Sequence, residues 1–127
     1  MDPKELVIAF FERLNAHDVA RLMPLLSDDH AFVNAAGEVR GRGREAMEQV
    51  WREYLEWFPD YRVGVDRVVA EGNVVALFGT VHGTPANDPA ATWDIPAAWQ
   101  CVIRDGRLSE LRIYVDTHPM RQAAEPG

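Results

Sequence analysis

Residues 61–82, YRVGVDRVVAEGNVVALFGTVH, are the most informative part of the sequence for the fold. Two valine-rich runs in this stretch flank Glu71-Gly72-Asn73. β-Branched residues favour strands, and a glycine-containing turn between two such runs is typical of a hairpin. We therefore expect two neighbouring antiparallel strands here, with His82 near the end of the second.

A second hairpin is expected around Asp105-Gly106, a two-residue turn signal between AAWQCVIR and RLSELRIYVD. A plain two-residue turn would place Ile103 opposite Leu108 and Trp99 opposite Arg112. The apolar residues Leu111, Ile113 and Val115 would then face the helices. The alternate face, with Trp99 beside it, is too rich in aromatic residues for a plain solvent-facing surface. It predicts a surface covered by a second copy of the chain, with stacked Trp–Arg contacts on a monomer as the alternative.

Helical patterns precede these strands. Asp2 and Pro3 are suited to the start of a helix whose apolar stripe includes Phe10 and ends near Ala16. A short helix is expected after Asp18, then a short strand pair, then a long helix from about residue 43 that Pro59 ends. Helices followed by a four-stranded antiparallel meander indicate an α+β fold, with the helices on one face of a curved sheet.

The composition excludes several classes of function. With 127 residues the chain is expected to be one domain, 1–127, with an ordered core over roughly 2–119 and a frayed C-terminal tail. A net charge of −7 argues against nucleic-acid binding, and no apolar run is long enough to span a membrane. A single cysteine, Cys101, and four scattered histidines predict no disulfide, no metal site and a cytoplasmic location.

The chain resembles a known family in four stretches: LNAHDVARLMPLLSDDHAFVN, GREAMEQVWREYLEWFPDYRVGVDRVVAEGN, GTVHGT and RDGRLSELRIYVD. They are similar to those of the SnoaL-like proteins, small polyketide cyclases of the nuclear transport factor two-like superfamily, which also includes ketosteroid isomerase-like proteins. The resemblance implies a cone-shaped, curved antiparallel sheet wrapped around N-terminal helices. It also implies a hydrophobic pocket for a small molecule and chemistry without a cofactor.

Two better-understood relatives do not fit. The ketosteroid isomerases have their base aspartate where this chain has Asn34, and an amide cannot accept a proton as a carboxylate does. The limonene epoxide hydrolases share Asn34 and the pattern LRIYVD, but Thr80 stands at their arginine. His82 and Ile113 stand at their two aspartates. Both established carboxylate sets are therefore missing.

The polyketide cyclases have an acid/base aspartate near the end of the last strand, to which Asp116 is similar. Their pocket histidine has no counterpart on the preceding strand, and His82 on the neighbouring strand is the expected substitute. The predicted catalytic residues are therefore His82 and Asp116. The predicted substrate-binding residues are Phe10, Asn34, Trp51, Tyr54, Phe78, Thr80, Gln100 and Ile113.

Each of these residues also has a structural interpretation. His82 could be a satisfied, partly exposed histidine at a strand end, and Asp116 could cap backbone or pair with Arg112 or Arg121. Asn34 could be a turn residue, and the aromatic residues could be plain core.

Three functions follow for a cavity that suits a small hydrophobic molecule with a carbonyl or hydroxyl group. The first is acid/base catalysis of cyclisation, isomerisation or lyase type. The second is binding or dimerisation without catalysis, and the third is epoxide-hydrolase-like addition of water.

Overall fold

The computed structural model describes residues 1–116. Its elements are α1 (Pro3–Asn15), α2 (Val19–Leu22), the short 3₁₀ helix η1 (Met23–Leu25), β1 (Leu26–Val33), β2 (Val39–Arg42), α3 (Arg44–Trp57), β3 (Arg62–Glu71), β4 (Val74–Gly83), β5 (Trp93–Arg104) and β6 (Arg107–Val115). This order confirms the predicted helices, strand pair and meander.

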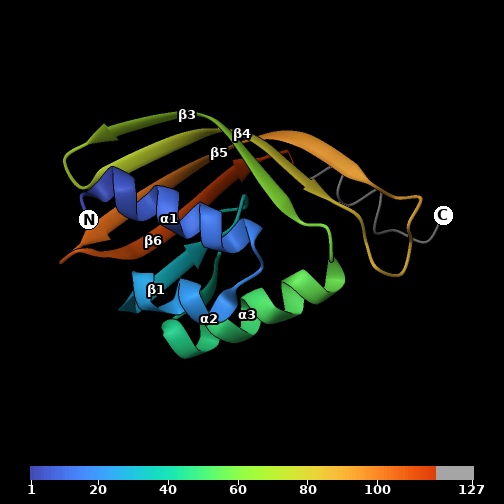
Figure 1. Ribbon diagram of the computed structural model, residues 1–127, viewed down its shortest axis with the longest axis horizontal. Coiled ribbons are helices and arrows are strands. Elements are labelled where there is room, and N and C mark those ends of the chain that lie inside the picture. Colours follow the sequence, from blue (N-terminus) through green and yellow to red (C-terminus); the bar gives the residue numbers. More distant parts are fainter. Residues whose placement is uncertain (117–127) are drawn as a thin grey trace.

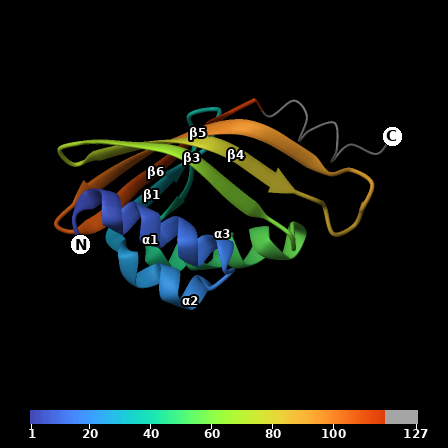
Figure 2. The same ribbon diagram turned by 45° about the horizontal axis from the view of Figure 1, so that its top comes forward.

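The six strands form one curved sheet in the order β2-β1-β6-β5-β4-β3. Figures 1 and 2 show the three α-helices against a single face of that sheet, which confirms the α+β fold. The sheet is mixed rather than wholly antiparallel, because β1 runs parallel to β6. The chain leaves β1, passes through α3 and the meander, and returns alongside β1 in the same direction. The strands within residues 1–116 do not close into a barrel.

The hairpin between β5 and β6 has the predicted turn, with Asp105 and Gly106 at φ angles of 53° and 73°. The predicted register beyond it is wrong. Ile103 does pair with Leu108, but Val102 pairs with Glu110, which leaves Ser109 as an extra residue. Such a β-bulge shifts every later pair by one position.

The shift moves one large aromatic residue to the other side of the sheet. Trp99 pairs with Ile113 rather than Arg112 and is buried on the helix-facing side. Gln100 takes the opposite face, where it pairs with Arg112. The prediction that Leu111 faces the helices is confirmed, since its side chain is 1% exposed.

Strand β4 has apolar residues on both faces. Val75, Leu77 and Val81 are buried against the helices, whereas Phe78 is 45% exposed on the outer face. The large apolar residues exposed on the described strands are Val39, Val65, Val69, Val74, Phe78 and Tyr114. The predicted dimer through the outer face of the sheet stays a prediction.

Helix α1 is fixed to the start of β3 by two side chains at its C-terminal end. The Asn15 amide donates to the carbonyl of Val63 and accepts from the backbone N–H of the same residue, both at 2.8 Å. The ring of His17, through Nε2, lies 2.8 Å from the carbonyl oxygen of Tyr61. These contacts set the position from which the Tyr61 side chain enters the interior.

No helix within residues 1–116 is both long and apolar enough to cross a bilayer. The predicted single domain and its frayed end beyond Pro119 extend past the described residues and stay predictions.

Candidate functional site

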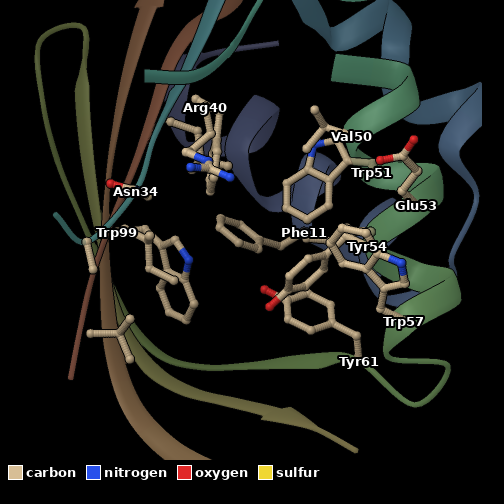
Figure 3. Close-up of a pocket in the computed structure, with 16 residues that line it drawn as sticks. Phe11, Asn34, Arg40, Val50, Trp51, Glu53, Tyr54, Trp57, Tyr61 and Trp99 are labelled. Carbon is tan, nitrogen blue, oxygen red and sulfur yellow. The ribbon is translucent and has the colours of Figure 1, made fainter. Parts of the chain in front are cut away.

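A cavity of about 370 Å³ lies between α1, α3 and the inner face of the sheet. Figure 3 shows the side chains that surround it. Its lining is predominantly apolar and aromatic: Phe11, Leu14, Phe32, Asn34, Ala35, Arg40, Val50, Trp51, Glu53, Tyr54, Trp57, Tyr61, Trp99, Leu111, Ile113 and Val115. A volume in this range with few polar groups is typical of sites for small organic molecules.

Seven of the described residues that line the cavity are aromatic, and several of their rings contact one another edge to face. The centroids of Tyr54 and Tyr61 are 5.0 Å apart at 85°, and those of Trp51 and Tyr54 are 6.0 Å apart at 90°. On the sheet side, Phe11 packs against Trp99 at 5.3 Å. Edge-to-face packing holds rings in place, so the wall is organised before any ligand arrives.

Two phenol groups enter this apolar space together. Figure 3 shows Tyr54 and Tyr61 side by side, with both hydroxyl oxygens directed into the cavity towards Trp99. Neither hydroxyl has a hydrogen bond to any residue in the described part of the chain. Burial raises the pKa of Tyr54, and burial together with the neighbouring Tyr54 raises the pKa of Tyr61 well above its ordinary value. Both groups therefore stay protonated near neutral pH and can donate hydrogen bonds.

The indole N–H of Trp51 is a further buried donor with no hydrogen-bond partner within residues 1–116. Its nitrogen is closed off from the cavity space by the surrounding rings, because Phe10 and Phe32 pack against Trp51 at 6.4 and 5.8 Å. We assign this N–H no contact with a ligand.

Charged and polar residues lie at the rim. Arg40 on β2 and Glu53 on α3 are both exposed, and the Glu53 carboxylate accepts a hydrogen bond of 3.2 Å from Gln49 one turn earlier. Trp57, at the end of α3, is 59% exposed. The rim therefore offers one cation, one anion and one aromatic face to an entering molecule.

Asn34 lines the cavity as predicted, but its side chain also forms hydrogen bonds within the turn between β1 and β2. Its carbonyl oxygen accepts hydrogen bonds from the backbone N–H groups of Ala36 and Glu38, at 3.0 and 2.9 Å. These bonds hold the turn between β1 and β2, which is the behaviour expected of a turn asparagine.

The prediction that His82 faces the cavity is wrong. Because Val81 faces the helices, alternation along β4 puts His82 and Thr80 on the other side of the sheet. The ring nitrogens of His82 lie 3.0 Å from the Asp60 carboxylate and 3.9 Å from that of Asp94, and the side chain is 38% exposed. This is the satisfied histidine at a strand end.

The Asp60 carboxylate joins this cluster to the next loop. It accepts hydrogen bonds of 2.7 Å from both the backbone N–H and the hydroxyl of Thr84, and these bonds, with His82, lower its pKa. The cluster ties the end of α3 to the end of β4 and does not contact the cavity.

Of the other predicted site residues, Trp51, Tyr54 and Ile113 line the cavity. Their roles in binding stay predictions. The predicted contact of Phe10, Phe78, Thr80 and Gln100 with the cavity is wrong. Asp116 is not among the described residues that line the cavity, and its catalytic role stays a prediction. Phe10 is fully buried behind Phe11, and Asp116 is exposed past the end of β6. Phe78, Thr80 and Gln100 lie on the outer face of the sheet.

Sequence reasoning missed Phe11, Arg40, Tyr61 and Trp99. Phe11 lies beside the apolar stripe of the first predicted helix, and Tyr61 lies at the start of a predicted strand. The sequence therefore contained a signal that could have found both residues. The positions of Arg40 and Trp99 depend on β-bulges, which the sequence pattern does not show. Among residues 1–116 no group of three or more His, Cys, Asp or Glu side chains could hold a metal ion.

Residues 7–111 match the SnoaL-like domain family. Among solved structures, the chain is similar to a nuclear transport factor two-like protein from Burkholderia thailandensis, with a TM-score of 0.87, 19% identity and 98% of each chain covered. It is also similar to a putative SnoaL-like polyketide cyclase from Shewanella denitrificans, with a TM-score of 0.81, 18% identity and 95% of each chain covered.

A third similar structure is a hypothetical protein with a ketosteroid isomerase-like fold from Catenulispora acidiphila, in complex with trimethylamine. Its TM-score is 0.83 at 18% identity, with 96% of this chain and 94% of that chain covered. At such identities these likenesses establish the fold. Among curated proteins, none matches this sequence.

Proposed function

The chain belongs to the SnoaL-like domain family, and on that basis we propose that it binds a small, mostly apolar molecule with a carbonyl or hydroxyl oxygen in the aromatic cavity. The hydroxyls of Tyr54 and Tyr61 donate hydrogen bonds to that oxygen. The observation that carries this proposal is the pair of phenol groups directed into the cavity with no partner in the described chain.

The physical reason is that two phenol donors lack an acceptor, which a ligand oxygen would supply. The two hydroxyls have no hydrogen-bond partner within residues 1–116, and a neutral hydrogen bond to a ligand oxygen would contribute about 0.5–1.5 kcal/mol each. One ligand oxygen has two lone pairs and could accept from both phenols. The rings around it would exclude water and cover the apolar body of the ligand.

A second candidate function is catalysis of cyclisation, isomerisation or lyase type on the same carbonyl compound. Two donors on one carbonyl oxygen would stabilise the negative charge that develops when a proton leaves the neighbouring carbon. Glu53 is the one carboxylate among the described residues that line the cavity, and it is the candidate base. The name of the Shewanella denitrificans protein, a putative polyketide cyclase, supports this candidate. No step in it requires a cofactor.

Water addition of the epoxide-hydrolase type has less support. The positions that would correspond to the arginine and one aspartate are Thr80 and His82, and both lie outside the cavity. The remaining matching residue, Asn34, is bonded within its own turn.

Two further expectations are part of the proposal. A second copy covers the outer face of the sheet, supported by Phe78 and Tyr114, each 45% exposed there. The location is cytoplasmic, supported by the single cysteine, Cys101, which is buried as a free thiol.

The test compares two ligands of the same shape, 2-acetylnaphthalene and 2-ethylnaphthalene, by calorimetric or fluorescence titration. We expect the ketone to bind more tightly than the hydrocarbon. Tyr54→Phe and Tyr61→Phe should each weaken ketone binding by roughly 2- to 13-fold, the equivalent of about 0.5–1.5 kcal/mol for one neutral hydrogen bond.

Tyr114→Phe is the matched control, because it removes the same hydroxyl from the outer face of the sheet. It should leave both affinities unchanged. Equal affinities for the ketone and the hydrocarbon, or ketone binding that survives both cavity substitutions, would contradict the proposed function.

A further inference from the structure

One cation lies among the described residues that line the cavity, and a β-bulge puts it there. On the β1–β2 pair, Phe32 is opposite Gly41 and Val33 is opposite Val39, which leaves Arg40 as an extra residue. A bulge redirects a side chain relative to simple alternation. Arg40 therefore faces the cavity, whereas Arg42 lines a separate hollow on the outer face of the sheet.

The guanidinium of Arg40 has no ion pair or hydrogen bond with any residue that the structure describes. Arginines nearby on α3 differ in this respect: Arg44 pairs with Asp28, and Arg52 pairs with Glu48 at 3.2 Å. The acidic residue on the opposite rim is Glu53, which accepts from Gln49. Arg40 thus keeps its donors available at the entrance of an aromatic cavity.

The Glu38 carboxylate, two residues before Arg40, is the other acid close by in sequence. It accepts a long contact of 3.4 Å from the side-chain amide of Asn34 at the β1–β2 turn. Neither Glu38 nor Glu53 forms an ion pair with Arg40 within residues 1–116.

The cavity has two different polar ends. Figure 3 shows the nitrogens of Arg40 at one end and the two phenol oxygens of Tyr54 and Tyr61 at the other, with the ring of Phe11 between them in this view. One end offers a positive charge with parallel N–H donors, and the other offers neutral hydroxyl donors. The walls between them are aromatic.

We infer that the occupant is an aromatic or otherwise apolar acid: its carboxylate pairs with Arg40, and its neutral carbonyl or hydroxyl reaches the tyrosine pair. This inference rests on the proposed function and adds the second polar end of the ligand. A planar guanidinium matches a carboxylate with two parallel hydrogen bonds, which gives orientation as well as affinity.

The net charge of the whole chain bears on where a preference for an acid can come from. With a net charge of −7 the protein repels anions at long range, so preference for an acid must come from a local cation. Arg40 is exposed, and its attraction for an anion is therefore screened by salt. At about 1 M salt the screening length is about 3 Å, and the preference should shrink.

The test uses 6-hydroxy-2-naphthoate, which has a carboxylate and a hydroxyl at opposite ends of a naphthalene, and its neutral methyl ester. Both are titrated into the full chain, Arg40→Gln and Arg42→Gln. The second variant is the matched control, since it removes the same charge from the same strand on the other face of the sheet. Thermal unfolding of each variant confirms that it is folded.

We expect the native chain to bind the acid at least about tenfold more tightly than the ester, a difference of about 1.4 kcal/mol. Arg40→Gln should abolish this preference by weakening acid binding alone, and Arg42→Gln should retain it. Equal affinities in the native chain, or a preference that persists in Arg40→Gln, would overturn the inference. So would equal losses in both variants, which would indicate general surface charge.

These results separate the inference from the proposed function. If the ester binds as tightly as the acid and Tyr61→Phe weakens its binding, the proposed function is sustained and the acid subsite is overturned. Failure of both ligands to bind at about 1 mM, a binding energy weaker than about 4 kcal/mol, would overturn both.

Discussion

The substitution Tyr61→Phe should separate binding from stability. The ring of Tyr61 packs against Trp51 at 6.4 Å, Tyr54 at 5.0 Å and Trp93 at 6.5 Å. Phenylalanine keeps all of these contacts, so the only loss is a hydroxyl with no partner in the described chain. Removal of an unsatisfied polar group is neutral or stabilising, whereas removal of a satisfied one is unfavourable by about 0.5–1.5 kcal/mol.

We therefore expect the free energy of unfolding of Tyr61→Phe to equal that of the native chain or to exceed it by up to about 1 kcal/mol. Ketone binding should weaken with the same substitution, so affinity falls while stability is unchanged or rises. Urea unfolding followed by tryptophan fluorescence measures the first quantity, and titration measures the second. A loss of stability greater than about 1 kcal/mol would show this expectation to be wrong, because it would mean that the hydroxyl is satisfied within the folded chain.

Three further predictions concern other parts of the molecule. His30 is fully buried, with Nδ1 2.7 Å from the carbonyl oxygen of Leu108. Burial lowers the pKa of His30 below its ordinary value of 6.5. The folded chain therefore has stability above pH 6.5 that is lost as the pH falls through the lowered pKa. The free energy of unfolding, measured between about pH 8 and pH 4, should fall by about 1.4 kcal/mol for each pH unit between the ordinary and the lowered pKa. His30→Gln should remove this pH dependence, and a pH dependence that persists in the variant would show that His30 is not its cause. Gly79→Ala should destabilise the fold by several kcal/mol in thermal unfolding, because a Cβ there would overlap the carbonyl of Gly64, and a neutral result would contradict the close strand approach. Phe78→Lys should convert the proposed dimer to a monomer in light scattering, and an unchanged mass would count against the outer face as the interface.

The order of elements could be predicted because the sequence signals were local. The cap at Asp2, whose side chain accepts from the Glu5 N–H at 2.8 Å, and the turn at Asp105-Gly106 each depend on a few adjacent residues. Helical spacing predicted α1 and α3 to within about two residues. These patterns need no knowledge of tertiary packing.

The sides of the strands were harder to predict, and the candidate site depends on them. Strand β4 alternates Val74, Ala76 and Phe78 with apolar residues on the other face, so its periodicity does not distinguish inside from outside. The placement of His82 and Thr80 followed from that choice and was wrong.

Single extra residues caused the remaining errors. The bulge at Ser109 moves Trp99 inward and Gln100 outward, and the bulge at Arg40 brings a charge to the cavity. Nothing in residue type marks these positions, because a bulge is set by strand pairing across the sheet. Phe10 and Phe11 are both buried, and the packed structure alone shows that Phe11 borders the empty space.

The proposed function depends on ligand contact with the tyrosine pair and not with His82. The decisive quantity is the affinity of 2-acetylnaphthalene for the double variant Tyr54→Phe/Tyr61→Phe, measured beside that for His82→Ala. We predict a loss in the double variant greater than in either single variant, and an affinity in His82→Ala equal to that of the native chain. Loss of binding in His82→Ala with retention in the double variant would contradict the proposed site and return it to the histidine at the end of β4.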